Sequence, residues 1–259
     1  MVVIVTRPAS AGKRLFDRVI EQGHRALWWP AFDIDAAPDV ERARESLARL
    51  AGYDLAIFVS MHAVRAARPL LDGAWPSGTM IGAVGASTRA AIEAELQPDP
   101  SLIVVAQDED QQSGSEAFWR AWQASARGAR RVMVLRAEDG RNWLSERFAE
   151  HGAQVDTVAV YSRHLHQVSV DERQQLQHWI AANERPAIIF SSTEAVAALD
   201  QQVDAIGQAW LRTGAAIACH PRIAEQLSSN GYARVINATF DDESIIAKLE
   251  SIGIQPQAL

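Results

Sequence analysis

Short apolar runs alternate with longer amphipathic stretches along the whole chain. Runs rich in Val, Ile and Phe, often apolar at every position, are typical of strands in buried parallel sheets. They predict strands over 2–6, 26–34, 55–60, 80–84, 102–106, 131–135, 155–161, 187–191, 215–219 and 234–237. Helical spacing of apolar residues predicts helices over 12–22, 41–50, 64–71, 87–96, 116–125, 141–151, 171–182, 193–199, 222–229 and 242–252. This alternation predicts an α/β fold with parallel sheets.

The chain also contains an internal repeat. Residues 3–7 (VIVTR) match residues 132–136 (VMVLR) at an offset of 129, and residues 56–60 (AIFVS) match residues 188–192 (IIFSS) at an offset of 132. Two further pairs of strands match in the same order. These ordered matches indicate duplication of a unit of about 130 residues. Because ten strands are more than one sheet comfortably holds, we expect two sheets of about five strands each.

Two extended segments, 26–36 and 154–168, interrupt the strand–helix pattern at equivalent places in the repeat. Each segment links one strand–helix unit to the next. A paired, two-stranded connector between two lobes would use both of them.

Charge and composition narrow the class of protein. The chain has 25 Lys and Arg residues against 32 Asp and Glu, a net charge of −7, which disfavours non-specific binding of nucleic acid. Because the net charge is negative, an anionic ligand must be bound by hydrogen-bond donors placed locally at its site. The single cysteine, Cys219, excludes an internal disulfide and the common zinc sites. No apolar run approaches the ~18 residues of a membrane span, and residues 1–8 lack a basic leader, so we expect a cytoplasmic enzyme or binding protein.

Candidate chemistry gathers where predicted strands end in small or hydroxyl residues just before a helix. Such turns contain Ser60, Gly85, Ser87, Thr88, Ser191 and Ser192. In open α/β sheets, ligands bind at the carboxyl ends of strands, and the free N–H groups that begin the next helix favour an anion. Simple N-capping by Ser and Thr is the alternative for any one turn. For the whole set, on facing lobes, we favour an anion-binding cleft.

A second group of candidates follows the predicted strand 131–135. Gly140 would allow the backbone to approach a ligand closely, and Arg136 and Arg141 would add charge-assisted donors. The alternative is that Arg136 pairs with Glu138 or Asp139 of the same loop.

Four further side chains lie near predicted strand ends. Tyr161 ends a connector strand, where its hydroxyl is either a donor to ligand or the wet tip of a packed aromatic. Arg222 is a candidate for binding an anion, whereas His220 either takes part or only caps a helix. We expect Cys219 to fill space at the end of a strand, because no His–Asp pair accompanies it in the sequence.

Taken together, several motifs resemble those of uroporphyrinogen-III synthases. They stand in order along nearly the whole chain: Val5-Thr6-Arg7-Pro8, Phe58-Val59-Ser60 with Ala63-Val64, Ala83-Val84-Gly85 with Thr88, Leu135-Arg136 with Gly140-Arg141 and Leu144, Gly152-Ala153 with Val155, Val160-Tyr161 with Arg163, and Phe190-Ser191-Ser192. Each motif is weak alone, but the ordered set is specific.

This resemblance implies two flavodoxin-like parallel-sheet domains joined by a two-stranded β-ladder linker. The first domain would comprise residues 1–34 and 166–259, and the second residues 38–155. The connectors would lie near 26–37 and 154–168.

The resemblance also implies a reaction. Members of the family cyclise the linear tetrapyrrole hydroxymethylbilane, with loss of water and inversion of ring D, to uroporphyrinogen III, a precursor of haem and sirohaem. This is the chemistry of a cyclising hydro-lyase that needs no metal or organic cofactor. The resemblance suggests a monomer, with no membrane or nucleic-acid partner, and leaves open a hand-over of substrate from hydroxymethylbilane synthase. Tyr161 matches the family tyrosine considered to help hydroxyl departure as a general acid.

We expect the substrate carboxylates to contact the strand ends of both lobes. The expected binding residues are Arg7, Ser60, Met61, His62, Gly85, Ser87, Thr88, Arg136, Gly140, Arg141, Ser191, Ser192, His220 and Arg222. The chain departs from the family pattern at Met61-His62, where many members have small polar residues. It departs again at 219–222, where many members have a Gly-x-x-Thr turn. At the second departure we expect Arg222 to bind a substrate carboxylate.

Two other functions compete with this interpretation. A non-catalytic, two-lobed binding protein for an anionic small molecule would close on its ligand without turnover. A nucleotide-dependent transferase is disfavoured, because the sequence has neither a P-loop nor a Gly-x-Gly-x-x-Gly motif.

Overall fold

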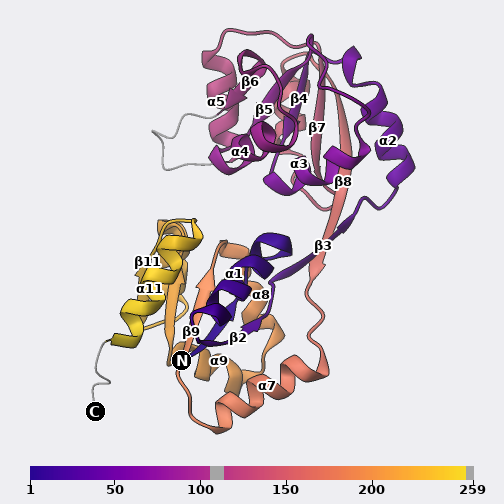
Figure 1. Cartoon of the computed structure of the whole chain (residues 1–259). Helices are drawn as coiled ribbons and strands as arrows, with labels where there is room; N and C mark the ends of the chain where they lie inside the picture. The colour runs from indigo at the N-terminus through magenta and orange to yellow at the C-terminus, as the bar shows by residue number, and fades with distance from the viewer. Residues whose placement is uncertain (106–113, 255–259) are drawn as a thin grey trace. The chain divides into compact units, whose positions relative to one another are not determined.

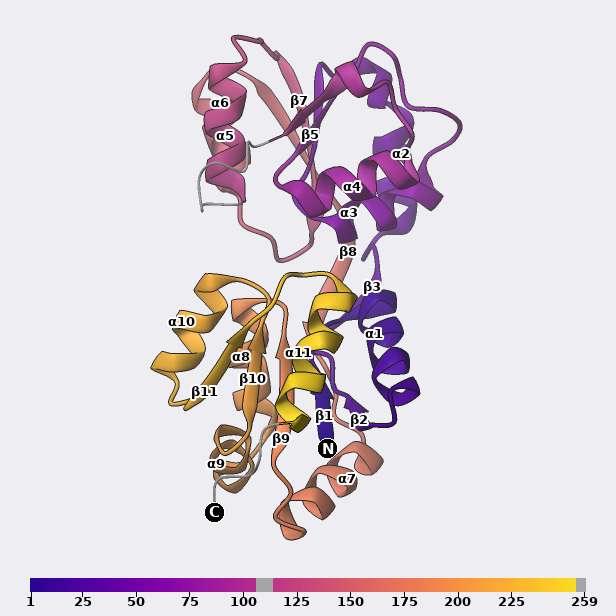
Figure 2. The same ribbon diagram turned by 60° about the vertical axis from the view of Figure 1, so that its left-hand side comes forward.

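A computed structural model describes residues 1–105 and 114–254. The chain divides into two compact units, Met1–Ile34 with His164–Leu259, and Asp35–Arg163. Within each unit, a mainly parallel sheet carries helices on both faces (Figures 1 and 2). The expected α/β fold with parallel sheets is confirmed.

The first unit is built on a five-stranded parallel sheet. Its strands are β1 (Val2–Val5), β2 (Arg25–Trp28), β9 (Pro186–Phe190), β10 (Ala215–Ala218) and β11 (Arg234–Asn237), in the order β11-β10-β9-β1-β2. Every residue of β1, β9 and β10 is buried, which explains their unbroken apolar sequences.

Helices cover both faces of this first sheet. The helices α7 (Val170–Ala181), α8 (Thr193–Gln202), α9 (Ala205–Arg212) and α10 (Pro221–Ser229) pack on the face that carries Ile4 and Ile188. The helices α1 (Ala9–Glu21) and α11 (Asp242–Ile254) pack on the opposite face, which carries Val3 and Ile189. Alternate residues of each strand therefore enter two separate cores.

The second unit contains a six-stranded sheet. Its strands are β3 (Phe32–Ala36), β4 (Leu55–Phe58), β5 (Met80–Ala83), β6 (Ile103–Val105), β7 (Arg131–Ala137) and β8 (Gln154–Leu165), in the order β3-β8-β7-β4-β5-β6. The helices are α2 (Val40–Ala48), α3 (Met61–Ala67), α4 (Ala86–Glu95), α5 (Ser115–Ala124) and α6 (Trp143–Glu150). Short 3₁₀ turns occupy Leu50–Gly52, Arg68–Leu70 and Pro100–Leu102. The aromatic side chains of α5 and α6 fill the core on one face of the sheet.

The repeat explains how the two sheets correspond. The first sheet has the strand order 2-1-3-4-5 that is typical of flavodoxin-like folds. The offset of 129 matches β7 to β1. With this match, the second sheet has the same strand order in β8-β7-β4-β5-β6. The second unit is thus a circularly permuted copy of the first, with β3 added beside β8.

The chain passes from one unit to the other in β3 and again at the end of β8. Ser162 Oγ donates to Ala36 O, and His166 N donates to Ala31 O, both at 3.3 Å. Because the partners run in opposite directions along the chain, these two strands are antiparallel. This pair is the two-stranded ladder that the extended segments predicted.

The structure differs from the predicted elements in three places. The strand predicted over 26–34 is wrong as a single element. Pro30 has no N–H to continue the hydrogen bonds of β2, and the chain forms β2 before this residue and β3 after it. The helix over 64–71 begins earlier, at Met61, because Ser60 caps it. Helix α9 was not predicted, although Asp204 supplies its N-cap. Ala106 of the strand over 102–106 lies outside the described residues.

Candidate active site

The parallel strands of the second unit end together at one edge of its sheet. The strands β8, β7, β4 and β5 are neighbours and run in the same direction. Their carboxyl ends are followed by the turns that contain Ser60, Gly85 and Gly140, while Tyr161 lies within β8 close to its end. The fold therefore gathers these predicted residues at the edge where ligands bind in such sheets.

A β-bulge sets the direction of Tyr161. Arg136 pairs with Ala159, but the next residue, Ala137, pairs with Tyr161, so Val160 is the extra residue. Without this slip, Tyr161 would lie on the opposite face of the sheet. The slip places Tyr161 on the same face of the sheet as Val158 and Leu135. Phe58 of β4 pairs with Leu135, so Ser60, two residues further along the chain, extends from this face as well. Tyr161 is 5 % exposed.

Ser60 and Tyr161 are joined by a hydrogen bond. Their hydroxyl oxygens are 3.1 Å apart. Ser60 Oγ also accepts a hydrogen bond from Ala63 N at 3.1 Å, so Ser60 is the N-cap of α3. The His62 ring lies beside the Tyr161 ring, with centroids 6.2 Å apart at an angle of 50°. Three predicted residues, from two strand ends, thus form one cluster.

The surroundings of His62 favour its neutral form. Burial lowers its pKa below the ordinary 6.5, and the nearby positive charges of Arg65 and Arg163 lower it further. A neutral imidazole next to Tyr161 does not add to the positive charge at this edge.

The turn after β5 presents backbone donors. Gly85 precedes α4, and this helix has no side-chain cap among the described residues. A Cβ at Gly85 would meet nothing within 4 Å, so the space beside this residue is open. Ser87 is exposed, whereas Thr88 is 2 % exposed. The N–H groups at the start of a helix favour an anion, as does its dipole.

Arg136 is occupied by its own loop. Its guanidinium donates to the carbonyl oxygens of Glu138 (3.3 Å) and Gly140, and to Asn142 Oδ1 (2.9 Å). A Cβ on Gly140 would come within 3.0 Å of Arg136 Nη1, so this glycine makes room for the arginine. Arg141, still 68 % exposed, pairs with Glu116 at 3.0 Å.

In the first unit, Arg7 is also bound internally. It is 3 % exposed, and its Nη1 lies 2.7 Å from Asp242 Oδ1. Its Nη2 donates to Phe240 O at 2.9 Å, and the guanidinium carbon lies 4.3 Å from the centre of the Phe240 ring. Next to it, burial raises the pKa of the Cys219 thiol, which fits a residue that fills space.

The remaining candidates of the first unit are helix caps and their neighbours. Ser192 Oγ accepts from Ala195 N at 3.1 Å at the start of α8, and Ser191 precedes it, half-buried. His220 Nδ1 accepts from Arg222 N at 3.2 Å, so this histidine caps α10, while the Arg222 side chain is exposed.

Several residues that contact these candidates could not be identified from the sequence. Asp242 and Phe240, which hold Arg7, lie more than 230 positions from it in the chain. Arg65, which lowers the pKa of His62, belongs to no motif. Only Arg163 stood in a motif, two residues after Tyr161.

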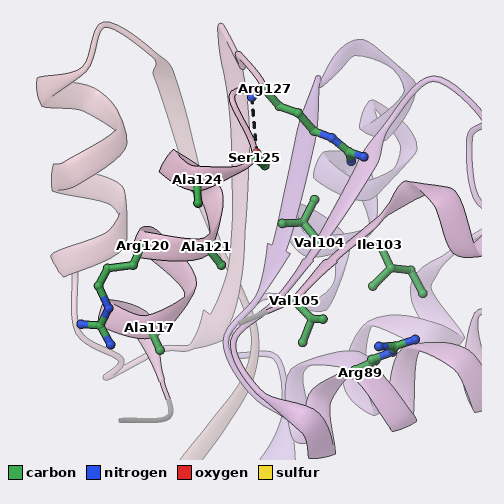
Figure 3. A pocket seen from close by; sticks show the side chains of 10 residues that line it. All are labelled: Arg89, Ile103, Val104, Val105, Ala117, Arg120, Ala121, Ala124, Ser125 and Arg127. Carbon is green, nitrogen blue, oxygen red and sulfur yellow. Dashed lines mark hydrogen bonds between the residues drawn. The ribbon is translucent and has the colours of Figure 1, made fainter. Parts of the chain in front are cut away.

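A separate pocket of about 660 Å³ lies in the second unit, beside β6 and α5 (Figure 3). Ile103–Val105 of β6 and the Ala117–Ala124 part of α5 form its apolar lining, and Arg89, Arg120 and Arg127 are at its rim. It contains none of the predicted site residues. Within the described residues, no group of three His, Cys, Asp or Glu side chains is placed to hold a metal ion, and no helix is long and apolar enough to cross a membrane.

Comparison with known proteins identifies the family. The family model described as "Uroporphyrinogen-III synthase HemD" matches residues 13–247. The chain belongs to the uroporphyrinogen-III synthase family. This is a family of cyclising lyases in tetrapyrrole synthesis, and membership does not favour the alternative of a non-catalytic binding protein.

Individual members of the uroporphyrinogen-III synthase family support this placement. The chain is 26% identical to the uroporphyrinogen-III synthase of Escherichia coli K12 over 215 residues, which are 82% of each chain. It is 29% identical over 166 residues to that of Salmonella typhimurium LT2, covering 63% of this chain and 65% of the relative.

Solved structures of the family share the fold. A mutant uroporphyrinogen III synthase from Thermus thermophilus aligns with a TM-score of 0.61 at 18% identity, covering 96% of this chain and 97% of that one. The enzyme from Helicobacter pylori 26695 aligns with a TM-score of 0.56 at 16% identity, covering 97% and 98%.

Proposed function

We propose that this protein cyclises hydroxymethylbilane, with inversion of ring D and loss of water, to uroporphyrinogen III. Family membership supports the reaction, and the Ser60–Tyr161 cluster at the carboxyl edge of the second sheet is the observation that carries the assignment of the site. Tyr161 is the proposed catalytic residue.

The proposed first step is departure of the substrate hydroxyl. Tyr161 Oη–H gives its proton to that hydroxyl, the C–O bond breaks with its electron pair on oxygen, and water leaves. The adjacent pyrrole nitrogen shares the positive charge that develops on carbon. That carbon then bonds to ring D at the α-carbon that already carries the methylene bridge, and the original bond between ring D and this methylene breaks. The released methylene bonds to the free α-carbon of ring D, which inverts the ring, and the proton lost from that carbon restores both the pyrrole and the tyrosine. A positioned acid of this kind contributes about 10²–10⁴-fold to a rate.

In this proposal, binding uses the strand-end turns of the two units and two exposed arginines, and Arg141 exchanges its partner Glu116 for a substrate carboxylate. The open turn at Gly85–Thr88, the exposed Arg141 and Arg222, and the turns at Ser60–His62 and Ser191–Ser192 are the proposed contacts for the substrate carboxylates. About eight such contacts at roughly 1 kcal/mol each would give micromolar affinity. Arg7, Arg136 and Gly140 hold the strand ends in shape, and His220 presents Arg222.

Positioning supplies the rest of the catalysis in this proposal. The substrate is a flexible chain that must be folded before its ends can react, and holding reacting groups in place removes a large part of such a barrier. Backbone donors on rigid strand ends suit this task better than mobile side chains do.

The decisive experiment is an isomer assay. The purified protein is incubated with hydroxymethylbilane, the products are oxidised to porphyrins, and isomers I and III are separated by chromatography. Spontaneous closure gives isomer I, so isomer III above the level of a heat-denatured control identifies the activity. Isomer I alone would reject the proposal.

Four finer properties are part of the proposal. We take the chain to be a cytoplasmic monomer whose domains meet near residues 34 and 164, and to receive its substrate from hydroxymethylbilane synthase. The division of the structure at 34/35 and 163/164 supports the domain boundaries. Light scattering coupled to gel filtration tests the oligomeric state, limited proteolysis tests the domain boundaries, and cell fractionation tests the cellular location. Coupled assays with and without a diluting trap test the hand-over.

A further inference from the structure

A partly exposed phenylalanine lies at the carboxyl edge of the first sheet. β11 ends at Asn237 and α11 begins at Asp242, so the turn between them is at the edge where parallel sheets bind ligands. Phe240 is in this turn and is 44 % exposed, although it is a large apolar residue. Part of its ring can therefore be reached by a ligand at this edge.

Hydrogen bonds fix the backbone on both sides of Phe240. Thr239 N donates to Ser244 Oγ at 3.1 Å, and Ser244 N donates to Asp241 Oδ1 at 2.8 Å. The carbonyl oxygen of Phe240 accepts from Arg7 Nη2 at 2.9 Å. The ring is thus held on a formed turn, and a contact that is already in place saves part of the entropy cost of binding.

A buried arginine lies against one face of the Phe240 ring. The Arg7 guanidinium carbon is 4.3 Å from the ring centre, and Arg7 is only 3 % exposed. The ring therefore covers Arg7, and its exposed part is the part that Arg7 does not touch. A cation on one face draws the π electrons toward itself, which favours an electron-rich partner on the other face. A pyrrole ring is an electron-rich partner of this kind.

A second guanidinium, that of Arg14, is bound to the same turn. Arg14 is in α1, whose side chains lean toward the start of the helix and hence toward the carboxyl edge of the sheet. Asp242 bridges the two arginines: Arg7 Nη1 is 2.7 Å from Oδ1, and Arg14 Nε is 3.3 Å from Oδ2. The Arg14 side chain is 60 % exposed, and within residues 1–105 and 114–254 the structure gives its Nη atoms no acceptor.

The pyrrole rings of hydroxymethylbilane match this pair of side chains. Each ring combines an electron-rich face with carboxylates on short side chains. An aromatic ring suits the face, and a guanidinium suits a carboxylate, which it binds with forked, charge-assisted hydrogen bonds. Phe240 and Arg14 offer both groups at one turn.

We propose that Phe240 and Arg14 form a binding subsite in the first unit for one pyrrole ring of the substrate: the ring stacks on Phe240, and one of its carboxylates pairs with Arg14. This inference rests on the proposed function, because that function supplies the ligand. Neither residue was among those predicted from the sequence. The contacts hold the ring alike before and during the reaction, so their loss changes KM and leaves kcat nearly unaltered.

Three single variants test the subsite. Phe240→Leu keeps an apolar side chain but removes the π face, and we expect KM to rise about fivefold with kcat within about twofold. Arg14→Gln removes a charged donor and should raise KM by about the same factor. Phe240→Tyr keeps the ring and should keep KM within about twofold of the wild type. A wild-type KM in Phe240→Leu would overturn the proposal.

Two residues of α1 provide matched controls. Arg18 lies one turn beyond Arg14, where an ion pair of 2.9 Å to α11 holds it. Phe16 is half-buried in the same helix and, like Phe240, has a cation near its ring. Arg18→Gln and Phe16→Leu should leave both constants unchanged. If they raised KM as much as Arg14→Gln and Phe240→Leu do, the effect would come from charge or packing in general, and the subsite would be refuted.

The double variant Phe240→Leu/Arg14→Gln tests whether the two side chains bind the same ring. If they do, loss of one contact weakens the other, and KM rises by less than the product of the two single effects. A rise equal to that product would mean that they bind separate parts of the substrate, which contradicts a shared subsite.

A binding measurement distinguishes failure of this inference from failure of the proposed function. The chain has seven phenylalanines, so protein labelled with 4-fluorophenylalanine gives seven ¹⁹F signals, and Phe240→Leu assigns that of Phe240. The probe is uroporphyrin III, the oxidised form of the proposed product, whose macrocycle has a strong ring current. It should shift the Phe240 signal more than that of Phe16. An unmoved Phe240 signal refutes the subsite even if the wild-type protein forms isomer III. A shifted signal in a protein that forms only isomer I would refute the function alone.

Discussion

The two units carry the same serine-capped turn but not the same chemistry. After β4, Ser60 caps α3 through Ala63 N, and after β9, Ser192 caps α8 through Ala195 N, both at 3.1 Å. The resemblance ends at β8, the strand of Tyr161, which β7 separates from β4. At the offset of 129, Tyr161 corresponds to Phe32 (161 − 129 = 32), which has no hydroxyl.

This difference shows how a duplicated fold divides its tasks. Turns that present backbone donors are a property of the fold, since parallel strands followed by helices produce them in both copies. The proposed acid, Tyr161, depends on a single residue, and the matching position of the repeat is a phenylalanine. We infer that the first unit serves binding and the second serves binding and proton transfer.

The two arginines that end the central strands show a second contrast. Arg7 follows β1 and is buried against Asp242 and Phe240, whereas Arg136 in β7 curls over the carbonyl oxygens of its own loop. Long-range contacts in one unit are thus replaced by local contacts in the other. Variants at such paired positions test the contrast between the two units.

Arg7→Met should be the most destabilising of these changes. It removes the buried partner of Asp242, and breaking a buried ion pair costs about 3–5 kcal/mol. The matched change Arg136→Met removes only exposed or part-buried bonds within a loop and should cost about 1 kcal/mol. Urea unfolding monitored by tryptophan fluorescence measures both. Equal losses would show that the two arginines play equivalent structural roles.

Tyr161→Phe should give the largest loss of activity. Without the phenol proton, kcat should fall about 100-fold, while the ring keeps its packing and the melting temperature stays close to that of the wild type. Phe32→Tyr restores a hydroxyl at the corresponding place in the other unit. It should not rescue activity in the Tyr161→Phe background, and a rescue would mean that either unit can supply the acid.

Arg222→Ala should raise KM about fivefold and leave kcat within twofold, because the lost contact binds substrate and transition state alike. Ser87→Ala, in the corresponding turn of the second unit, should raise KM less, since it removes a neutral donor. Initial rates of isomer III formation provide both constants. An unchanged KM in Arg222→Ala would remove Arg222 from the binding site.

His62 should make stability depend on pH in one direction. Its folded pKa is lowered, so the unfolded chain binds more protons just below the unfolded value of 6.5. The stability that the neutral ring contributes is present above pH 6.5 and is lost as the pH falls through the folded pKa. His62→Gln should flatten this dependence. Burial also lowers the pKa of His24, so His24 contributes a pH dependence of the same sign. This contribution remains in the His62→Gln variant and serves as an internal reference.

Patterns that are local in the chain were predictable. The fully apolar strands β1, β9 and β10 and the repeat between the units were sufficient to predict the parallel α/β fold. Helix α9 was missed because it has only eight residues and closely follows α8, although Asp204 marks its start. The break at Pro30 was hidden inside a continuous apolar run.

Features that depend on tertiary contacts were not predictable. The hydrogen bond between Ser60 and Tyr161 joins residues 101 positions apart and depends on a bulge that no residue pattern reveals. The sequence suggested that Gly140 makes space for a ligand, whereas in the structure the space beside it holds Arg136. Candidate residues can be recognised from a sequence motif, but the residues that contact them can be identified only from the fold.

The central claim is that this chain directs ring closure with the phenol of Tyr161. The most direct measurement is the ratio of isomers III and I that wild-type and Tyr161→Phe proteins form from hydroxymethylbilane at the same concentration and within the lifetime of the free substrate. We predict mostly isomer III with the wild type and mostly isomer I with the variant. Isomer I from both, or isomer III at equal rates from both, would contradict the account.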